Sequence, residues 1–214
     1  MTASAETRRD AMVARQIAAR GIRDARLLAA MRTVPRELFV PADLAEFAYS
    51  DTPLPIAAGQ TISQPYIVAW MIDAARIAPD DCVLEVGAGS GYAAAVLSRL
   101  ADQVFAIERH AELAHAAELR LARLGYANVT VIVGDGSGGL PDKAPFDAIL
   151  VSARGTEAPA ALESQLVLGG RLIMPIGGED VQSLCRITRH GKAAWAREDL
   201  GPVRFVPLIG ARGL

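Results

Sequence analysis

The segment "VLEVGAGSGYAAAVL", residues 83–97, runs from a short apolar stretch through three glycines into an alanine-rich stretch. The apolar stretch predicts a buried strand, and the alanine-rich stretch predicts a helix. Gly87, Gly89 and Gly91 let the backbone turn tightly between the two and let a ligand lie against main-chain atoms. Dinucleotide-binding folds use such a turn too, so the glycines alone do not identify the ligand. The dinucleotide fingerprint requires a small residue three places after the second glycine, and Tyr92 occupies that position.

Strand and helix patterns alternate on the carboxyl side of this turn. Apolar runs at residues 82–86, 104–108, 129–133, 147–152 and 171–176 are separated by helical stretches such as 92–101 and 110–125. This alternation is typical of right-handed crossover units in a parallel sheet. The runs are apolar throughout, as expected for strands buried on both faces.

After Pro175 the alternation ends, and the remaining sequence predicts strands of a different kind. The segments "VQSLCRITRHGKAAWARED" and "VRFVPLIG" read as strands, with a turn at His190 and Gly191. We expect them to be antiparallel strands at one edge of the sheet. The predicted fold is therefore α/β, with a doubly wound, mostly parallel seven-stranded sheet.

Short helices are predicted before the sheet. The stretch "TRRDAMVARQIAARGI" has apolar residues interleaved with arginines, with Thr7 as its expected cap and Gly21 as its expected end. A second helix, residues 24–32, has Asp24 as its cap. We expect a single domain, in which residues 1–78 are a helical extension that includes a polar loop and residues 79–214 are the α/β core.

Composition limits the partners and the location. The chain has 214 residues, 51% of them hydrophobic, and its 22 basic and 24 acidic residues give a net charge of −2. Such a balance does not predict a nucleic-acid binder. Cys82 and Cys185 indicate neither a disulfide framework nor a metal site. The first residues lack a signal-peptide pattern, and the chain has no apolar run of membrane-spanning length, so we expect a cytoplasmic protein with no membrane partner.

Three acidic residues stand at the carboxyl ends of three successive predicted strands. Glu85 suits a cationic part of a ligand, Glu108 can accept hydrogen bonds from ribose hydroxyls, and Asp135 with Gly136 can meet an adenine amino group. These positions converge on the crevice where open α/β sheets bind ligands. A ligand with a ribose, an adenine and a cation is S-adenosylmethionine. The alternative is that the three carboxylates cap helices or face solvent.

The polar loop "GQTISQP", residues 59–65, precedes a predicted helix that has Pro65 in its first turn. With this loop the sequence resembles the protein-L-isoaspartate (D-aspartate) O-methyltransferases. The resemblance covers nearly the whole chain, and it rests on "MVARQIAARGIRDARLLAAMRTVPRELFVP", "AYSDTPLPIAAGQTISQPYIVAWM", "VLEVGAGSGY", "AIERHAELA", "LGYANVTVIVGDG", "LGGRLIMPIG" and "VRFVPLIG". The glycine motif is shared by many methyltransferases, whereas the "GQTISQP" and "RFVPL" motifs are much more specific.

The resemblance implies a Rossmann-like class I methyltransferase with S-adenosylmethionine as its cofactor. It implies that Ser63 is the active-site serine, that Thr61 and Ser63 contact the cofactor, and that Arg109, within "AIERHAELA", belongs to the cofactor site. The family methylates the free α-carboxylate of isoaspartyl residues in damaged proteins and peptides, and the ester then collapses to a succinimide. We expect a monomer that needs no metal.

This chemistry explains the polar loop. The acceptor carboxylate is ionised at neutral pH, so no general base is required. Strong ionic stabilisation would favour the ground state of the carboxylate, whereas neutral hydroxyls and main-chain amides orient it without holding it too tightly. Ser63 has a second interpretation, as the N-cap of the following helix.

Several residues differ from the family pattern and leave the identity of the methyl acceptor open. Arg154 and Gly155 replace small residues and a proline-containing loop that the family usually has, and Ala93 replaces a larger polar residue. Asp51 and Arg204 are candidates for the border of the peptide site, while His110 and His115 are expected to face solvent. Two other functions therefore remain: a carboxyl methyltransferase with a different dedicated acceptor, and a non-catalytic module that binds S-adenosylmethionine.

Overall fold

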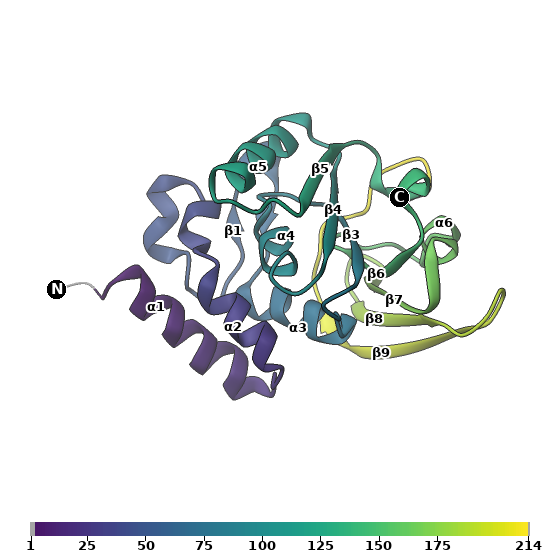
Figure 1. Ribbon diagram of the computed structural model, residues 1–214, viewed down its shortest axis with the longest axis horizontal. Coiled ribbons are helices and arrows are strands. Elements are labelled where there is room, and N and C mark those ends of the chain that lie inside the picture. The colour runs from purple at the N-terminus through teal and green to yellow at the C-terminus, as the bar shows by residue number, and fades with distance from the viewer. Residues whose placement is uncertain (1–2, 214) are drawn as a thin grey trace.

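The computed structural model describes residues 3–213 and contains one seven-stranded sheet with helices on both faces (Figure 1). Its strand order is β5-β4-β3-β6-β7-β8-β9. The strands are β3 (Cys82–Val86), β4 (Gln103–Glu108), β5 (Val129–Val133), β6 (Phe146–Val151), β7 (Leu166–Gly177), β8 (Gln182–Arg189) and β9 (Trp195–Val203). The first five are parallel to one another, whereas β8 is antiparallel to β7 and β9 is antiparallel to β8. The predicted fold class is confirmed.

The order of the sheet places a ligand crevice at β3. The chain passes from β3 to β4 and β5 on one side and then crosses to β6 and β7 on the other, so the winding direction changes beside β3. Ligands of doubly wound sheets bind outside the carboxyl ends of the strands at such a switch point. The glycine turn follows β3 at this point.

Both faces of the sheet are buried by apolar side chains. Successive residues of a strand point to opposite faces, and Val83 and Leu84 accordingly belong to two different hydrophobic clusters. The helices are α3 (Pro65–Ala75), α4 (Tyr92–Leu97), α5 (Ala111–Arg123) and α6 (Ala160–Ser164). The first three contribute to the Val83 cluster, and α6 contributes Leu162 to the Leu84 cluster.

Two predictions about strands are wrong. β5 is an edge strand and is not buried on both faces; Val133 is 46% exposed. The segment "VRFVPLIG" is not a strand beyond Val203, because Val203 pairs with Gln182, the first residue of β8, and no partner strand continues past it. Its chain instead runs along the β6 end, where the Arg154 amide donates to the Val206 carbonyl at 2.8 Å.

The helical extension shares its core with the sheet. It comprises α1 (Ala5–Met12), a continuation to Arg20 through a π turn and a 3₁₀ turn, and α2 (Ala25–Thr33). Gly21 ends the first segment in a left-handed conformation, and Asp24 caps α2, both as predicted. The cap of α1 is Ser4 and not Thr7, because the Thr7 amide donates to the Ser4 hydroxyl at 3.1 Å. The single domain with its division at residues 78 and 79 stays a prediction that this shared core supports.

Short turns complete the fold. A two-stranded antiparallel hairpin consists of β1 (Leu54–Pro55) and β2 (Thr61–Ile62). The remaining 3₁₀ turns are Arg36–Phe39, Ala42–Phe47, Ala57–Gly59, Gly136–Gly138 and Pro141–Lys143.

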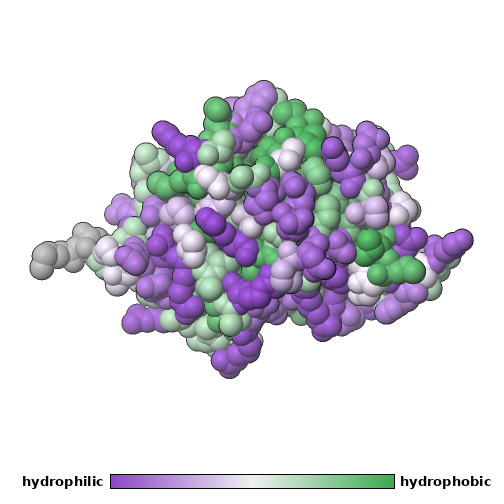
Figure 2. Space-filling view, in the orientation of Figure 1, coloured by the Kyte–Doolittle hydropathy of each residue, from purple (hydrophilic) through white to green (hydrophobic). Residues whose placement is uncertain are grey.

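On the face that Figure 2 shows, apolar residues lie in small groups among hydrophilic ones.

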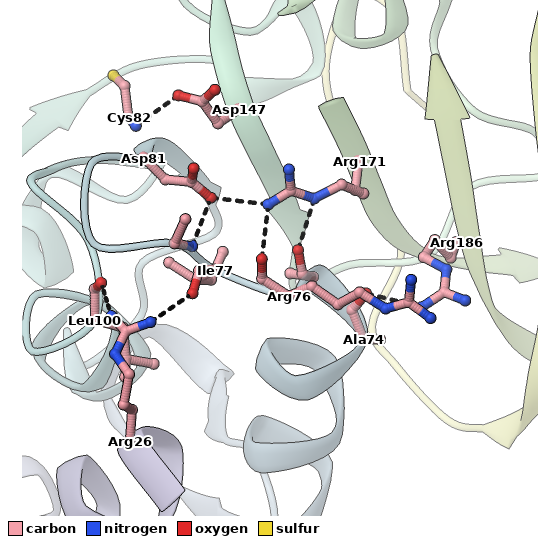
Figure 3. A network of polar contacts seen from close by, with 12 residues as sticks. Arg26, Ala74, Arg76, Ile77, Asp81, Cys82, Leu100, Asp147, Arg171 and Arg186 are labelled. Atoms are coloured by element: carbon pink, nitrogen blue, oxygen red, sulfur yellow. Dashed lines mark hydrogen bonds and ion pairs between the residues drawn. The ribbon is translucent and has the colours of Figure 1, made fainter. Parts of the chain in front are cut away.

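A network of arginine contacts lies where the parallel strands begin, at the end of the sheet opposite the glycine turn (Figure 3). The Arg171 guanidinium on β7 donates to the carbonyls of Ala75 and Arg76 at the end of α3, at 2.7 and 3.0 Å. It also donates to the Asp81 carboxylate at 2.8 Å. These contacts fix the end of α3 against the sheet and lie far from the glycine turn along the strands.

Both cysteines are free, Cys185 buried and Cys82 partly buried. Among residues 3–213 no group of His, Cys, Asp and Glu side chains has the geometry of a metal site. None of the helices described is both long and apolar enough to cross a bilayer.

Candidate active site

A cavity of about 800 Å³ opens at the carboxyl edge of the sheet. Its walls come from the glycine turn, the end of β4, the loop before α3, one side of α3 and the C-terminal segment 202–209. Of the site residues predicted from the sequence, the structure brings eight into this wall: Thr61, Ser63, Glu85, Gly87, Gly89, Glu108, Arg109 and Gly136. Gly91 and Asp135 are not part of the wall.

The glycine turn is built as the sequence predicts. Gly87 and Gly89 have positive φ angles of 89° and 53°, which a residue with a side chain rarely adopts. Gly91 has a different role, because a Cβ atom there would lie 3.2 Å from both Ala117 and Leu121 on α5. It therefore allows close packing of α5 and begins α4, and it does not face the cavity.

Glu108 holds two main-chain amides at the cavity wall. Its Oε2 accepts a hydrogen bond from the Gly89 amide and its Oε1 accepts one from the His110 amide, both at 2.9 Å. The side chain is buried, and each carboxylate oxygen has a further lone pair. Glu108 thereby fixes the glycine turn and can still accept two hydroxyl groups of a ligand.

Glu85 is buried and incompletely satisfied. It is 2% exposed, and its Oε2 has no hydrogen-bond partner among the described residues. Burial, and after it the negative charge of Glu108, raise the pKa of Glu85 to about 8, while the Ala94 amide opposes the shift. An unpartnered carboxylate oxygen in a cavity wall is a site for a cation or a hydrogen-bond donor of a ligand.

The Asp135 carboxylate accepts hydrogen bonds from the protein itself and does not line the cavity, so its predicted contact with adenine stays a prediction. Its Oδ1 accepts hydrogen bonds from the amide and hydroxyl of Ser137, at 2.9 and 2.7 Å, and its Oδ2 accepts one from the Ala211 amide at 2.7 Å. These bonds lower the pKa of the carboxyl, first through Ala211. Asp135 holds the C-terminal segment against the β5 end, and Gly136 alone of this pair lines the cavity.

We expect Asp135→Ala to leave cofactor affinity within about threefold of the wild type, because the side chain does not reach the cavity. The loss of three hydrogen bonds should instead lower the free energy of unfolding by about 1–3 kcal/mol. Calorimetric titration with S-adenosylhomocysteine and urea unfolding measure the two quantities. A loss of affinity above tenfold in the folded variant would restore Asp135 to the ligand site.

The loop before α3 presents Ser63 to the cavity. Thr61 belongs to β2, Pro65 is the first residue of α3 as predicted, and the N-cap of α3 is Gln64 without a side-chain cap bond. The interpretation of Ser63 as a helix cap is therefore wrong. The Ser63 carbonyl accepts a hydrogen bond from Arg36 at 2.8 Å, which holds the turn from its inner side.

The mouth of the cavity carries residues that sequence reasoning missed. Tyr66 and Trp70 stack on α3 with ring centroids 5.9 Å apart, and the Arg20 guanidinium lies 3.5 Å over the Tyr66 ring. Arg20 also pairs with Asp51 at 2.9 Å, so Asp51 anchors the loop to the extension. Only the helical spacing of Tyr66 and Trp70 could have indicated this stack, and a core face gives the same spacing.

The lining of the cavity shows where the other residues considered in the sequence analysis lie. Arg204 lines it, as the expectation of a rim residue requires. Arg154 does not: it is buried behind residues 206–208, and its guanidinium faces Glu179 at 3.8 Å. His110 lines the wall although we expected it in solvent, whereas His115 is exposed as expected.

A doubly wound sheet whose glycine turn opens on a cavity is a Rossmann-like fold. Similar solved structures are methyltransferases, so this protein has the fold of the Rossmann-like methyltransferases. The family model for protein-L-isoaspartate(D-aspartate) O-methyltransferase matches residues 7–213. The chain belongs to this family, as the sequence resemblance indicates.

Similar proteins match this chain over most or all of its length. A protein-L-isoaspartate O-methyltransferase from Rhodopseudomonas palustris is 57% identical over 203 residues, covering 94% of this chain and 93% of that protein. One from Methylorubrum populi is 58% identical and covers all of both chains. A Plasmodium falciparum structure of the same description, in complex with S-adenosyl-L-homocysteine, has a TM-score of 0.82 at 26% identity and covers 94% of this chain and 98% of that one.

Proposed function

We propose that the cavity binds S-adenosylmethionine and an isoaspartyl segment together and that the protein methylates the free α-carboxylate of that segment. The resulting ester leads to a succinimide and so begins the repair of damaged proteins. The observation that carries the proposal is that one cavity joins Glu85 and Glu108 on the sheet to Ser63 on the loop before α3.

Each part of the cofactor has a counterpart in the wall. Glu108 would accept the ribose hydroxyls, because the Gly89 and His110 amides fix its two oxygens and leave a lone pair on each. Glu85, with its unpartnered oxygen, is placed to face the positive charge. Gly87 and Gly89 leave their main chain open to the ligand, and Gly136 gives room near the β5 end. Asp135 is not part of this proposal.

S-adenosylmethionine supplies a methyl group on a sulfonium, which the acceptor carboxylate takes while S-adenosylhomocysteine leaves. No side chain has to remove a proton, since the acceptor is ionised at neutral pH. The task of Ser63 and Thr61 is to orient one acceptor oxygen with neutral donors. Tyr66, Trp70 and the segment 202–209 exclude water, so that orientation counts for more.

Cofactor affinity should rise with pH, because Glu85 is protonated in the free protein below its pKa of about 8. A cation prefers the ionised carboxylate, so binding at low pH must release this proton. We expect the affinity for S-adenosylmethionine to rise at least about tenfold from pH 6 to pH 8 and to level off above pH 9. Calorimetric titration at several pH values measures this rise.

The variant Glu85→Gln is the control for the pH effect, since glutamine has a similar shape and does not titrate. Its affinity should be weak and nearly constant over the same range. An equally steep rise in the variant would assign the titration to another group.

The test of the function uses two peptides that differ only in an isoaspartyl or an aspartyl linkage. With methyl-labelled S-adenosylmethionine, we expect labelled methanol to be released with the isoaspartyl peptide only, as its short-lived ester breaks down. Cofactor binding without transfer to either peptide would indicate a binding module or a different dedicated acceptor. Equal transfer to both peptides would contradict the proposed specificity.

A further inference from the structure

Arg36 is a buried cation that has no role in the reaction proposed above. It is 0% exposed, and among the described residues it is the largest fully buried side chain by volume. Among residues 3–213 no carboxylate lies within ion-pair distance of it. Burial lowers its pKa to about 10, so the guanidinium remains charged at neutral pH. Burying an unneutralised charge is costly and needs compensation from well-placed acceptors.

The acceptors of Arg36 are main-chain carbonyls of two separate loops. Its Nε donates to the Ala48 carbonyl at 2.7 Å, and its Nη2 donates to the Ser63 carbonyl at 2.8 Å. Ala48 ends the 3₁₀ turn of the extension, and Ser63 lies immediately before the N-cap of α3. A single rigid guanidinium thus ties the seryl turn to the extension.

The same guanidinium also lies over an aromatic ring that directly follows the glycine turn. Its central carbon lies 4.8 Å from the ring centroid of Tyr92, the first residue of α4 after Gly91. Tyr92 is 1% exposed and packs edge-on against Phe39 at 5.6 Å, so its ring is fixed. Arg36 therefore spans from the side of the cavity that holds Ser63 to the side that begins the cofactor turn.

We propose that Arg36 is a positioning residue for methyl transfer, which sets the distance between the Ser63 turn and the glycine turn. This inference rests on the proposed function. Arg36 does not line the cavity and acts only through Ser63 and Tyr92. No side chain caps the start of α3, so the hydrogen bond from Arg36 holds the Ser63 carbonyl just before this helix. A displacement of about 1 Å between reacting groups can lower a rate about a hundredfold.

The test compares Arg36→Met and Arg36→Lys with the wild type. Methionine fills much of the volume without charge or donors, and lysine keeps the charge but cannot form the planar contact with two carbonyls and a ring. We expect kcat for the isoaspartyl peptide to fall at least about tenfold in both variants, with the larger loss in Arg36→Met. The Kd for S-adenosylhomocysteine should stay within about threefold, because the cofactor contacts remain.

Arg171→Met is the matched control, because Arg171 also donates to two carbonyls but at the opposite edge of the sheet (Figure 3). It leaves Asp81 without its partner, so its stability should fall while kcat stays within about twofold of the wild type. A merely structural role for Arg36 predicts that both arginine variants lose activity only in proportion to their stability.

Two results would overturn the inference: wild-type kcat in folded Arg36→Met, or equal kcat in Arg36→Lys and Arg171→Met. If Arg36→Met does not fold, the comparison of Arg36→Lys with Arg171→Met decides alone. The wild-type enzyme with the paired peptides tests the proposed function separately. Transfer by the wild type with no effect of the Arg36 variants would reject only the role of Arg36.

Discussion

Ser63→Ala should lower kcat for an isoaspartyl peptide by about 10- to 150-fold. This range corresponds to the loss of one hydrogen bond to a charged group, worth about 1.5–3 kcal/mol. The free energy of unfolding should change little, since Ser63 does not cap α3 and the bond from Arg36 goes to its main-chain carbonyl. Steady-state kinetics with labelled cofactor and thermal unfolding measure both effects.

Ser164→Ala is a suitable control for Ser63→Ala, because the Ser164 hydroxyl donates to the nearby Ala161 carbonyl at 3.0 Å and lies outside the cavity. Its kcat should equal that of the wild type. A folded Ser63→Ala enzyme with turnover within twofold of the wild type would remove Ser63 from the catalytic role.

Glu108→Ala should weaken cofactor binding by at least about 100-fold, which corresponds to about 3 kcal/mol. The variant loses the acceptor of the ribose hydroxyls and also the bonds that hold the Gly89 and His110 amides. The fold should persist, since these bonds lie at the rim and not in the hydrophobic clusters. Calorimetric titration with S-adenosylhomocysteine measures the change.

Two further variants make the Glu108 result specific. Glu108→Gln keeps the shape and one acceptor oxygen, so its affinity should lie between those of the wild type and Glu108→Ala. Glu118→Ala removes an exposed carboxylate from α5 and should bind normally. Unchanged affinity in Glu108→Ala would reject the proposed orientation of the cofactor.

Much of the fold could be predicted because its signals are local. Apolar runs of strand length alternate with helical stretches, and the glycine turn marks the switch point beside β3. The path of residues 204–210 could not be predicted in this way. Its residues have strand-like composition, but whether they form a strand depends on whether β8 extends far enough to pair with them. That is a property of the sheet and not of the segment.

The site was predictable where a residue's position on a strand determines its direction. Glu85 and Glu108 meet in one cavity because neighbouring parallel strands bring their carboxyl ends together. Asp135 follows the same pattern but closes a turn with Ser137 and holds Ala211, a residue 76 positions away in the chain. Arg36 was missed because arginine is usually exposed, and nothing in "VPRELFV" indicates burial.

The most direct measurement is a crystal structure of the protein with S-adenosylhomocysteine and an isoaspartyl peptide. The predicted complex has the ribose at Glu108 and the sulfur facing the Ser63 turn across the cavity. The peptide's free α-carboxylate should lie within hydrogen-bond distance of the Ser63 hydroxyl. A sulfur that points away from this turn, or a peptide carboxylate bound outside the cavity, would contradict the shared site on which the proposed methyl transfer depends.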